Sequence, residues 1–124
     1  MTGAVFDASA LIALLKREPG WEGVEHALTT GGFCSAANWA EVAQKVKAFD
    51  FPWDTARGFL RSYGLTVVPV LEDDAERAAQ LWKAGEGLSL ADRLCLALAD
   101  RLQLPALTAD RAWVGKHPRA ELIR

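Results

Sequence analysis

The sequence has little cysteine and little histidine, with two of each among 124 residues. Cys34 and Cys95 both stand among apolar residues, and neither has a Cys or His at metal-ligand spacing. We therefore expect both thiols to be small hydrophobic core residues, and we expect no zinc site. His26 and His117 belong to no motif, so we assign neither of them a role.

Long apolar stretches are also missing, although 51% of the residues are hydrophobic. The longest early stretch ends at Lys16 and falls short of the ~18 residues that a membrane helix needs. The N-terminus has no basic segment, and Asp7 interrupts its first apolar run, which argues against a signal peptide. We expect a cytoplasmic protein without a membrane segment, folded as one domain over residues 1–124.

An excess of positive charge is absent too, because 14 basic and 16 acidic residues leave a formal charge of −2. This balance argues against a nucleic-acid binder that works by bulk electrostatic attraction. It leaves room for an enzyme whose clustered carboxylates are neutralised by metal, while scattered basic residues hold phosphates. Arg93, Arg111 and Lys116 are candidates for such contacts, although such residues are more often solvated surface.

The chain does contain short apolar segments that alternate with helical ones. We predict strands at residues 4–6, 33–35, 66–70 and 105–108 and near 121–123, and helices at 8–16, 21–28, 36–49, 54–63, 72–83 and 89–102. Asp54 is the expected cap of the fourth helix. Strands that alternate with helices of this length indicate an α/β fold around a parallel sheet.

Four acidic residues stand at or near the predicted strand-to-helix transitions: Asp7, Glu41, Asp92 and Asp110. Ligands of an open parallel sheet bind beyond the carboxyl ends of its strands. Carboxylates gathered there repel one another unless they are protonated or bind a hard cation, and Mg²⁺ and Mn²⁺ prefer oxygen ligands. Such a metal can assist phosphodiester hydrolysis, so we predict that these four acids form a catalytic metal site.

Each acid taken alone also has a structural explanation as a helix cap. Asp7 stands where it could cap the helix that begins at Ala8, although Ser9 could cap that helix instead or orient Asp7. Asp110 could cap a short helix at Arg111. The other two acids have the spacing of a capping box, in the pairs Ser89–Asp92 and Asn38–Glu41.

The stretches around these acids resemble the PIN-domain family, and most closely the VapC-type toxins of bacterial toxin–antitoxin modules. The similar stretches are residues 5–11 (VFDASAL), 38–42 (NWAEV), 88–93 (LSLADR) leading into 95–99 (CLALA), and 107–113 (LTADRAW). They occur in the order of the family and span essentially the whole chain. Four motifs in order are far more specific than any one of them.

The resemblance implies a three-layer α/β/α sandwich with a central, mainly parallel sheet, and a Mg²⁺- or Mn²⁺-dependent endoribonuclease. It implies that Asp7 and Asp92 bind the metal directly, together with Glu41 and Asp110. It further implies an RNA substrate, a homodimer and a cognate antitoxin whose tail occupies the active-site groove. The residues that match supporting hydroxyl or amide positions are Ser9, Asn38, Ser89 and Thr108.

The sequence departs from some relatives after the last acid. Those relatives carry a further acid two residues beyond it, whereas Ala112 stands at that position here. A second metal ion would then have fewer ligands, so occupancy by two metal ions is left open.

The aromatic residues permit two interpretations. Phe49, Phe51 and Trp53 surround Pro52 between two predicted helices, where they form either a satellite of the core or an exposed patch that docks a partner helix. The tryptophans outside this segment are more often core or groove lining than platforms for RNA bases: Trp39, Trp82 and Trp113.

Two other functions fit parts of the pattern. A phosphatase of the haloacid-dehalogenase type also places an Asp after its first strand, but it needs an acid two residues later, where this chain has Ser9. A non-catalytic RNA-binding or interaction module on the same fold would be favoured if site acids were missing. All four acids are present, so we favour the nuclease.

Overall fold

The computed structural model describes residues 2–124, which form a five-stranded sheet in the order β3-β2-β1-β4-β5. The strands are β1 (Ala4–Phe6), β2 (Gly32–Ser35), β3 (Thr66–Val68), β4 (Ala106–Thr108) and β5 (Ala120–Leu122). All four pairings between them are parallel. In the central strand β1, Val5 pairs with Phe33 of β2 on one side and with Ala106 of β4 on the other.

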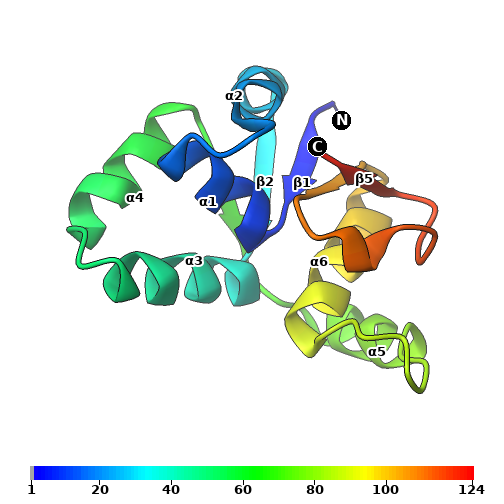
Figure 1. The fold of residues 1–124 in the computed structure, drawn as a ribbon. Helices are drawn as coiled ribbons and strands as arrows, with labels where there is room; N and C mark the ends of the chain where they lie inside the picture. The colour runs from blue at the N-terminus through cyan, green and yellow to red at the C-terminus, as the bar shows by residue number, and fades with distance from the viewer. Residues whose placement is uncertain (1) are drawn as a thin grey trace.

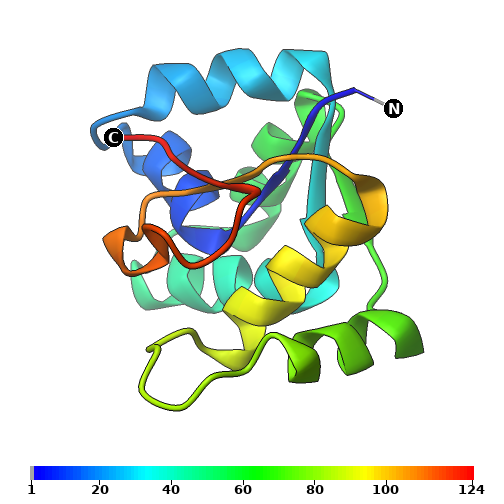
Figure 2. The same cartoon turned by 90° about the vertical axis from the view of Figure 1, so that its right-hand side faces the viewer.

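Helices cover both faces of this sheet. They are α1 (Ala8–Lys16), α2 (Trp21–Thr30), α3 (Ala36–Ala48), α4 (Trp53–Ser62), α5 (Glu72–Gln80) and α6 (Leu90–Leu102), followed by the short 3-10 helix η1 (Arg111–Trp113). Helices α1 to α4 lie on one side of the strands, and α5 and α6 lie on the other (Figure 1). Figure 2 shows the α5 and α6 side facing the viewer. The predicted three-layer α/β/α sandwich is therefore confirmed.

Alternating side chains of β1 serve the two cores that lie between these layers. Ala4 and Phe6 pack with residues of α1 to α4, whereas Val5 packs with residues of α6 and β4. All three residues are buried, which is the burial expected of a central strand that is covered on both faces. Cys34 and Cys95 are free and fully buried, as predicted, and burial raises the pKa of both thiols.

Several predicted boundaries differ from the structure. Strand β3 ends at Val68 instead of residue 70 because Pro69 cannot donate a ladder hydrogen bond. Helix α4 begins at Trp53 after Pro52, so the predicted cap, Asp54, lies in the first turn instead. An acid there is still favoured by the positive end of the helix dipole. Helix α2 extends to Thr30, two residues further than predicted, and α5 ends at Gln80, three residues earlier.

The tryptophans divide between core and surface. Trp113 is 1% exposed in the core beside α6, and Trp39 packs edge-on against Trp53 with their ring centroids 5.1 Å apart. The prediction that Trp82 lies in the core or lines a groove was wrong, because its side chain is 60% exposed beyond the end of α5.

No helix within residues 2–124 is both long enough and apolar enough to cross a membrane.

The order of the strands defines where a ligand is expected. The chain passes from β1 outward to β2 and β3, and then returns to add β4 and β5 on the opposite side of β1. The switch point therefore lies between β1 and β4, and parallel sheets bind ligands at the carboxyl side of such points. Asp7 directly follows β1 there, and Asp110 lies two residues beyond β4.

Candidate active site

The four predicted acids line one polar pocket of about 240 Å³ at the carboxyl edge of the sheet. Asp7 comes from the β1–α1 junction, and Glu41 comes from α3, which follows β2. Asp92 comes from the first turn of α6, and Asp110 precedes η1. The other residues that line the pocket are Ala8, Ser9, Lys45 and Ser89. Residues separated by up to 103 positions in the sequence thus converge on one site, although their catalytic role stays a prediction.

Asp7 is the most deeply placed of the four acids, with 3% of its surface exposed. Its carboxylate caps α1 by accepting a hydrogen bond of 2.9 Å from the Ala10 amide, so Asp7 is the cap and Ser9 is not. Burial raises the pKa of Asp7 from 3.8 to about 6, although hydrogen bonds from Thr108, Ala10 and Ser9 oppose the shift. The nearby charge of Asp92 raises this pKa further. Asp7 is therefore a buried acid whose negative charge a bound cation would stabilise.

Two hydroxyl groups fix the position of Asp7. The Thr108 hydroxyl donates to Asp7 at 2.6 Å, and the Ser9 hydroxyl contacts both carboxylate oxygens at 2.8 and 2.9 Å. Ser9 Oγ also accepts from the Ala109 amide at 2.8 Å, while Thr108 Oγ1 accepts from the Asp110 amide at 3.0 Å. Each hydroxyl therefore accepts from a backbone amide and donates to the Asp7 carboxylate, which fixes the carboxylate relative to the chain beyond β4.

The three other carboxylates each use one oxygen in a local hydrogen bond. Glu41 Oε1 accepts from the Asn38 side chain at 3.1 Å, Asp92 Oδ2 from the Ser89 amide at 2.9 Å, and Asp110 Oδ1 from the Ala112 amide at 2.9 Å. The second oxygen of each has no hydrogen-bond partner in the part of the chain that the structure describes. Capping and cation binding are therefore compatible roles for the same side chain.

Asn38 ties the two helices that carry Glu41 and Asp92. It is fully buried, and its amide nitrogen donates both to Glu41 and to the backbone carbonyl of Ala91 in α6, at 3.1 and 3.2 Å. Its side-chain oxygen has no partner within residues 2–124. Asn38 thereby links Glu41 to the helix that carries Asp92, while its supporting role at the site stays a prediction.

Comparison with known protein families and structures identifies the fold. The family model described as "PIN domain" matches residues 4–115. The chain belongs to the PIN domain family. PIN domains are generally nucleases, and PIN nucleases typically use divalent metal ions.

Two solved structures resemble this PIN domain over nearly its whole length. One is described as a toxin–antitoxin complex from Klebsiella pneumoniae, with a TM-score of 0.81, 24% identity and 98% of each chain covered. The other is PAE2754 from Pyrobaculum aerophilum, with a TM-score of 0.66, 20% identity, and 98% of this chain and 84% of that chain covered. At these identities the likeness shows the fold alone. A search of curated protein sequences found no match.

The donors of this PIN domain fit a hard divalent cation. All the ligand candidates are carboxylate oxygens, three carboxylates have an oxygen without a partner, and the fourth is a buried acid, Asp7. No group of three His, Cys, Asp or Glu side chains within residues 2–124 already stands close enough to hold a metal ion. Glu41 and Asp92 are half-buried and Asp110 is exposed, whereas hydrogen bonds hold the buried carboxylate of Asp7 in place.

The basic residues around the site differ from expectation. Arg93 was a candidate for phosphate contact, although such residues are more often solvated surface; its guanidinium instead turns to α5 and donates to the Ala78 carbonyl at 2.8 Å. Lys116 donates to the Glu86 carbonyl at 3.0 Å, whereas Arg111 is exposed. The sequence analysis missed Lys45, which lines the acidic pocket. Its position four residues after Glu41 on one helix was the signal available.

Proposed function

We propose that this PIN domain is a metal-dependent endoribonuclease that hydrolyses RNA phosphodiester bonds. The observation that carries the proposal is that four carboxylates line one pocket at the switch point of the sheet. Mg²⁺ or Mn²⁺ would be held by Asp7 and Asp92, with Asp110 and Glu41 completing the set. When bound, such an ion would stabilise negative charge on the phosphate and make a water molecule more acidic.

The residues of the chain supply position and charge for this chemistry. Ser9 and Thr108 hold Asp7 in place, so its carboxylate needs little rearrangement to bind a cation. Asn38 orients Glu41, and the Ser89 amide orients Asp92. Removing charge at Asp7 or Asp92 should therefore abolish hydrolysis while the fold persists, because Asp and Asn have almost the same shape.

The test is RNA cleavage by the purified protein with Mn²⁺, with Mg²⁺ and with a chelator. Asp7→Asn and Asp92→Asn should each lower the cleavage rate at least about a thousandfold, as expected when a catalytic metal site is lost. Glu76→Gln is the matched control, since Glu76 is an exposed acid on α5 outside the pocket, and it should cut like the wild type. Cleavage that survives in both site variants would contradict the assignment. RNA binding without cleavage under either metal would instead favour the non-catalytic module.

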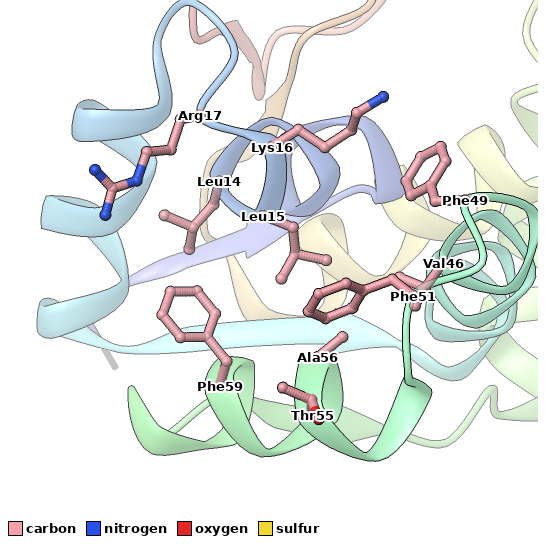
Figure 3. Close-up of a pocket in the computed structure, with 10 residues that line it drawn as sticks. All are labelled: Leu14, Leu15, Lys16, Arg17, Val46, Phe49, Phe51, Thr55, Ala56 and Phe59. Carbon is pink, nitrogen blue, oxygen red and sulfur yellow. The ribbon is translucent and has the colours of Figure 1, made fainter.

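We further propose that the chain is the toxin of a toxin–antitoxin pair, as in the complex from Klebsiella pneumoniae whose chain shares its fold. A second and larger cavity, of about 640 Å³, supplies a place for the partner. Its apolar walls come from the end of α1, from α4 and from the connection between α3 and α4 (Figure 3). We call this cavity the apolar groove.

The apolar groove has the chemistry of a docking site for an amphipathic helix. Phe49, Phe51 and Phe59 line it and are 42%, 49% and 42% exposed, which is unusual for phenylalanine. Lys16 and Arg17 stand at its rim, and the Lys16 ammonium lies 4.2 Å from the centre of the Phe49 ring. An apolar floor with a cationic rim fits a helix that has apolar side chains on one face and acidic ones beside them. Of the two interpretations of the aromatic segment, the exposure of Phe49 and Phe51 supports the docking one, whereas Trp53 packs against the core.

The apolar groove and the acidic pocket share two helices. Helix α1 contributes Ser9 to the acidic pocket and Leu14 to the apolar groove, so a helical rise of about 8 Å separates these two lining residues. A partner helix in the apolar groove therefore needs only a short tail to reach the acids. This arrangement supports an antitoxin that occupies the active site from a neighbouring dock.

Inducible expression in a bacterial host tests the toxin proposal. The wild type should arrest growth, and co-expression of the product of the adjacent gene should restore it, whereas Asp7→Asn should be harmless. Phe59→Asp should remain toxic but escape rescue, because it buries a charge in the apolar groove. Val70→Asp, at an exposed apolar side chain outside the groove, is the control that should still be rescued. Rescue of Phe59→Asp as complete as that of the wild type would place the partner elsewhere.

We also propose that the enzyme acts in the cytoplasm and forms a homodimer. Trp82 and Leu90 are 60% and 59% exposed and stand at the adjoining ends of α5 and α6, which supports a self-association surface there. The mass in solution should therefore be that of two chains. Trp82→Asp combined with Leu90→Asp should give one chain, measured by light scattering, and a dimer that survives both changes would exclude this surface.

A further inference from the structure

Lys45 places a positive charge at the edge of a pocket that is otherwise built of acids. It is the only basic residue among those that line the acidic pocket in the described part of the chain. Glu41 and Lys45 are separated by one helical turn of α3, so both side chains lie on the face of the helix that meets the pocket. Asn38 begins the same face at its buried end.

The ammonium group of Lys45 is not used by the protein itself. A Glu and a Lys four residues apart on a helix commonly pair, yet Lys45 is absent from the ion pairs found within residues 2–124. Glu41 instead accepts a hydrogen bond from Asn38. Among the other basic residues close in sequence to the site, Arg93 and Lys116 donate to backbone carbonyls, and Arg111 is exposed but does not line the acidic pocket.

An RNA backbone approaching four carboxylates is repelled, and the cation that would bind among them offsets only part of that charge. A free ammonium at the rim gives a phosphate oxygen a favourable partner beside the acids, because Lys45 follows Glu41 by about one helical turn on α3. A contact with phosphate fixes position without reading a base. The location of Lys45 therefore suits an anchor for the substrate strand.

We propose that Lys45 binds a backbone phosphate of the RNA next to the cleaved position, as a substrate-anchoring residue. This inference rests on the proposed ribonuclease function. Lys45→Gln should weaken RNA binding and raise KM, with a smaller change in kcat. Lys45→Arg should retain most of the binding because it keeps the charge. The Mn²⁺ affinity should stay the same or increase, because Lys45→Gln removes a positive charge from beside the carboxylates.

Lys47 provides a matched control on the same helix. It carries the same charge and is also exposed, but it lies about 200° around α3 from Lys45 and outside the acidic pocket. Lys47→Gln changes the net charge of the protein by the same amount. A general loss of electrostatic attraction would affect both variants, whereas a specific phosphate contact affects only Lys45→Gln.

The experiment measures binding of a fluorescent single-stranded RNA pool of random sequence at several salt concentrations, in an Asp92→Asn background so that RNA stays intact. We expect Lys45→Gln to bind several-fold more weakly and to lower the slope of log affinity against log salt by about 0.7, the value for one phosphate contact to a single strand. Lys45→Arg and Lys47→Gln should keep the slope of the parent. Steady-state cleavage in the otherwise wild-type protein then separates KM from kcat.

Equal slopes for Lys45→Gln and the parent would overturn the proposal, and so would equal losses in Lys45→Gln and Lys47→Gln. A fall in kcat at unchanged RNA affinity would also overturn it, since an anchor acts on binding. If the wild type fails to cut RNA with either metal, the ribonuclease function itself is wrong. If the wild type cuts RNA and Lys45→Gln behaves identically, only the role of Lys45 is wrong.

Discussion

Asp7 stabilises the start of α1 by capping it, but its buried negative charge destabilises the folded state. Its carboxylate caps α1 and receives the Ser9 and Thr108 hydroxyls, but burial raises its pKa to about 6, and the nearby charge of Asp92 adds to the shift. A cap alone would be better placed at the surface, where it stays ionised without cost. The depth of Asp7 therefore fits the proposed role of this residue in binding a cation.

The first prediction concerns the pH dependence of stability in metal-free protein. Because the folded-state pKa of Asp7 lies above 3.8, the folded state binds more protons between about pH 4 and pH 6, so stability falls as pH rises through this range. The Asp7→Asn variant does not lose stability over this pH range, because Asn carries no carboxylate. The side-chain oxygen of Asn can still accept the hydrogen bond from the Ala10 amide. Above pH 6 the variant should be more stable than the wild type by an amount on the order of 2–3 kcal/mol.

Urea unfolding of both proteins in chelator, from about pH 4 to about pH 7, measures this difference. The difference in the free energy of unfolding between Asp7→Asn and the wild type should increase with pH and become constant above about pH 6. A variant that is less stable than the wild type at neutral pH, or a gap that does not change with pH, would contradict the account of Asp7.

The second prediction concerns the hydroxyl groups that support Asp7. Ser9→Ala removes the donor to the carboxylate and the acceptor of the Ala109 amide. Loss of such a supporting contact typically costs 10- to 100-fold in metal affinity or activity. Titration with Mn²⁺ should show this loss in Ser9→Ala, while Ser62→Ala, whose hydroxyl bonds only a local carbonyl on α4, should bind as the wild type does. Similar Mn²⁺ affinity in Ser9→Ala and Ser62→Ala would mean that Ser9 has only a structural role.

At the scale of the elements, the start of α6 combines a cap with a candidate metal ligand. Ser89 Oγ accepts from the Asp92 amide at 3.1 Å, and Asp92 Oδ2 accepts from the Ser89 amide at 2.9 Å, which completes a capping box. The sequence motif therefore permitted two explanations, and the structure shows the capping box, while Asp92 also lines the acidic pocket. Capping uses Asp92 Oδ2, while the other oxygen remains available at the pocket.

The third prediction separates these two roles. Ser89→Ala should lower the free energy of unfolding by about 1 kcal/mol, as expected for a lost N-cap, and leave most of the Mn²⁺ affinity. Asp92→Asn should do the opposite, because the Asn oxygen can still accept from the Ser89 amide while the negative charge is lost. Chemical unfolding and metal titration on both variants provide the comparison. Equal effects of the two substitutions on both quantities would mean that capping is the whole role of Asp92.

Sequence patterns predicted the elements better than the direction of individual side chains. Each strand and helix was predicted close to its place because apolar periodicity and stop signals are local, and the boundary errors at Pro69 and Asp54 arose at turns. Arg93 adjoins Asp92 in the sequence, but its helix position directs it to α5. Lys45 was missed because one lysine on a helix is usually solvated. Its pocket exists only once α3 meets α6 and the strand ends.

At the scale of the whole molecule, the site and the main polar network occupy different parts of the fold. Asp100 near the end of α6 pairs with Arg77 of α5 at 2.9 Å, and with His117 and Arg119 of the C-terminal segment at 3.1 and 3.4 Å. This network joins α5, α6 and the chain leading into β5. It gives His117 a structural role, which no motif in the sequence indicated.

The fourth prediction is that this network supports stability without affecting the site. Asp100→Asn removes the shared charge, so the free energy of unfolding should fall by about 1–3 kcal/mol. The Mn²⁺ affinity of the folded protein should not change, since Asp100 lies outside the acidic pocket. Unfolding in urea and metal titration below the transition check the two parts. A parallel loss of metal affinity would show that the two regions are coupled.

The central claim is that Asp7, Glu41, Asp92 and Asp110 form one divalent-metal centre, and Mn²⁺-dependent thermal stabilisation tests it most directly. A ligand present at a hundred times its Kd stabilises the folded state by about 2.7 kcal/mol, which raises Tm by several degrees in a protein of this size. The account predicts this rise for the wild type and for Glu76→Gln, and none for Asp7→Asn combined with Asp92→Asn. An equal rise in the double variant, or no rise in the wild type at millimolar Mn²⁺, would contradict the claim.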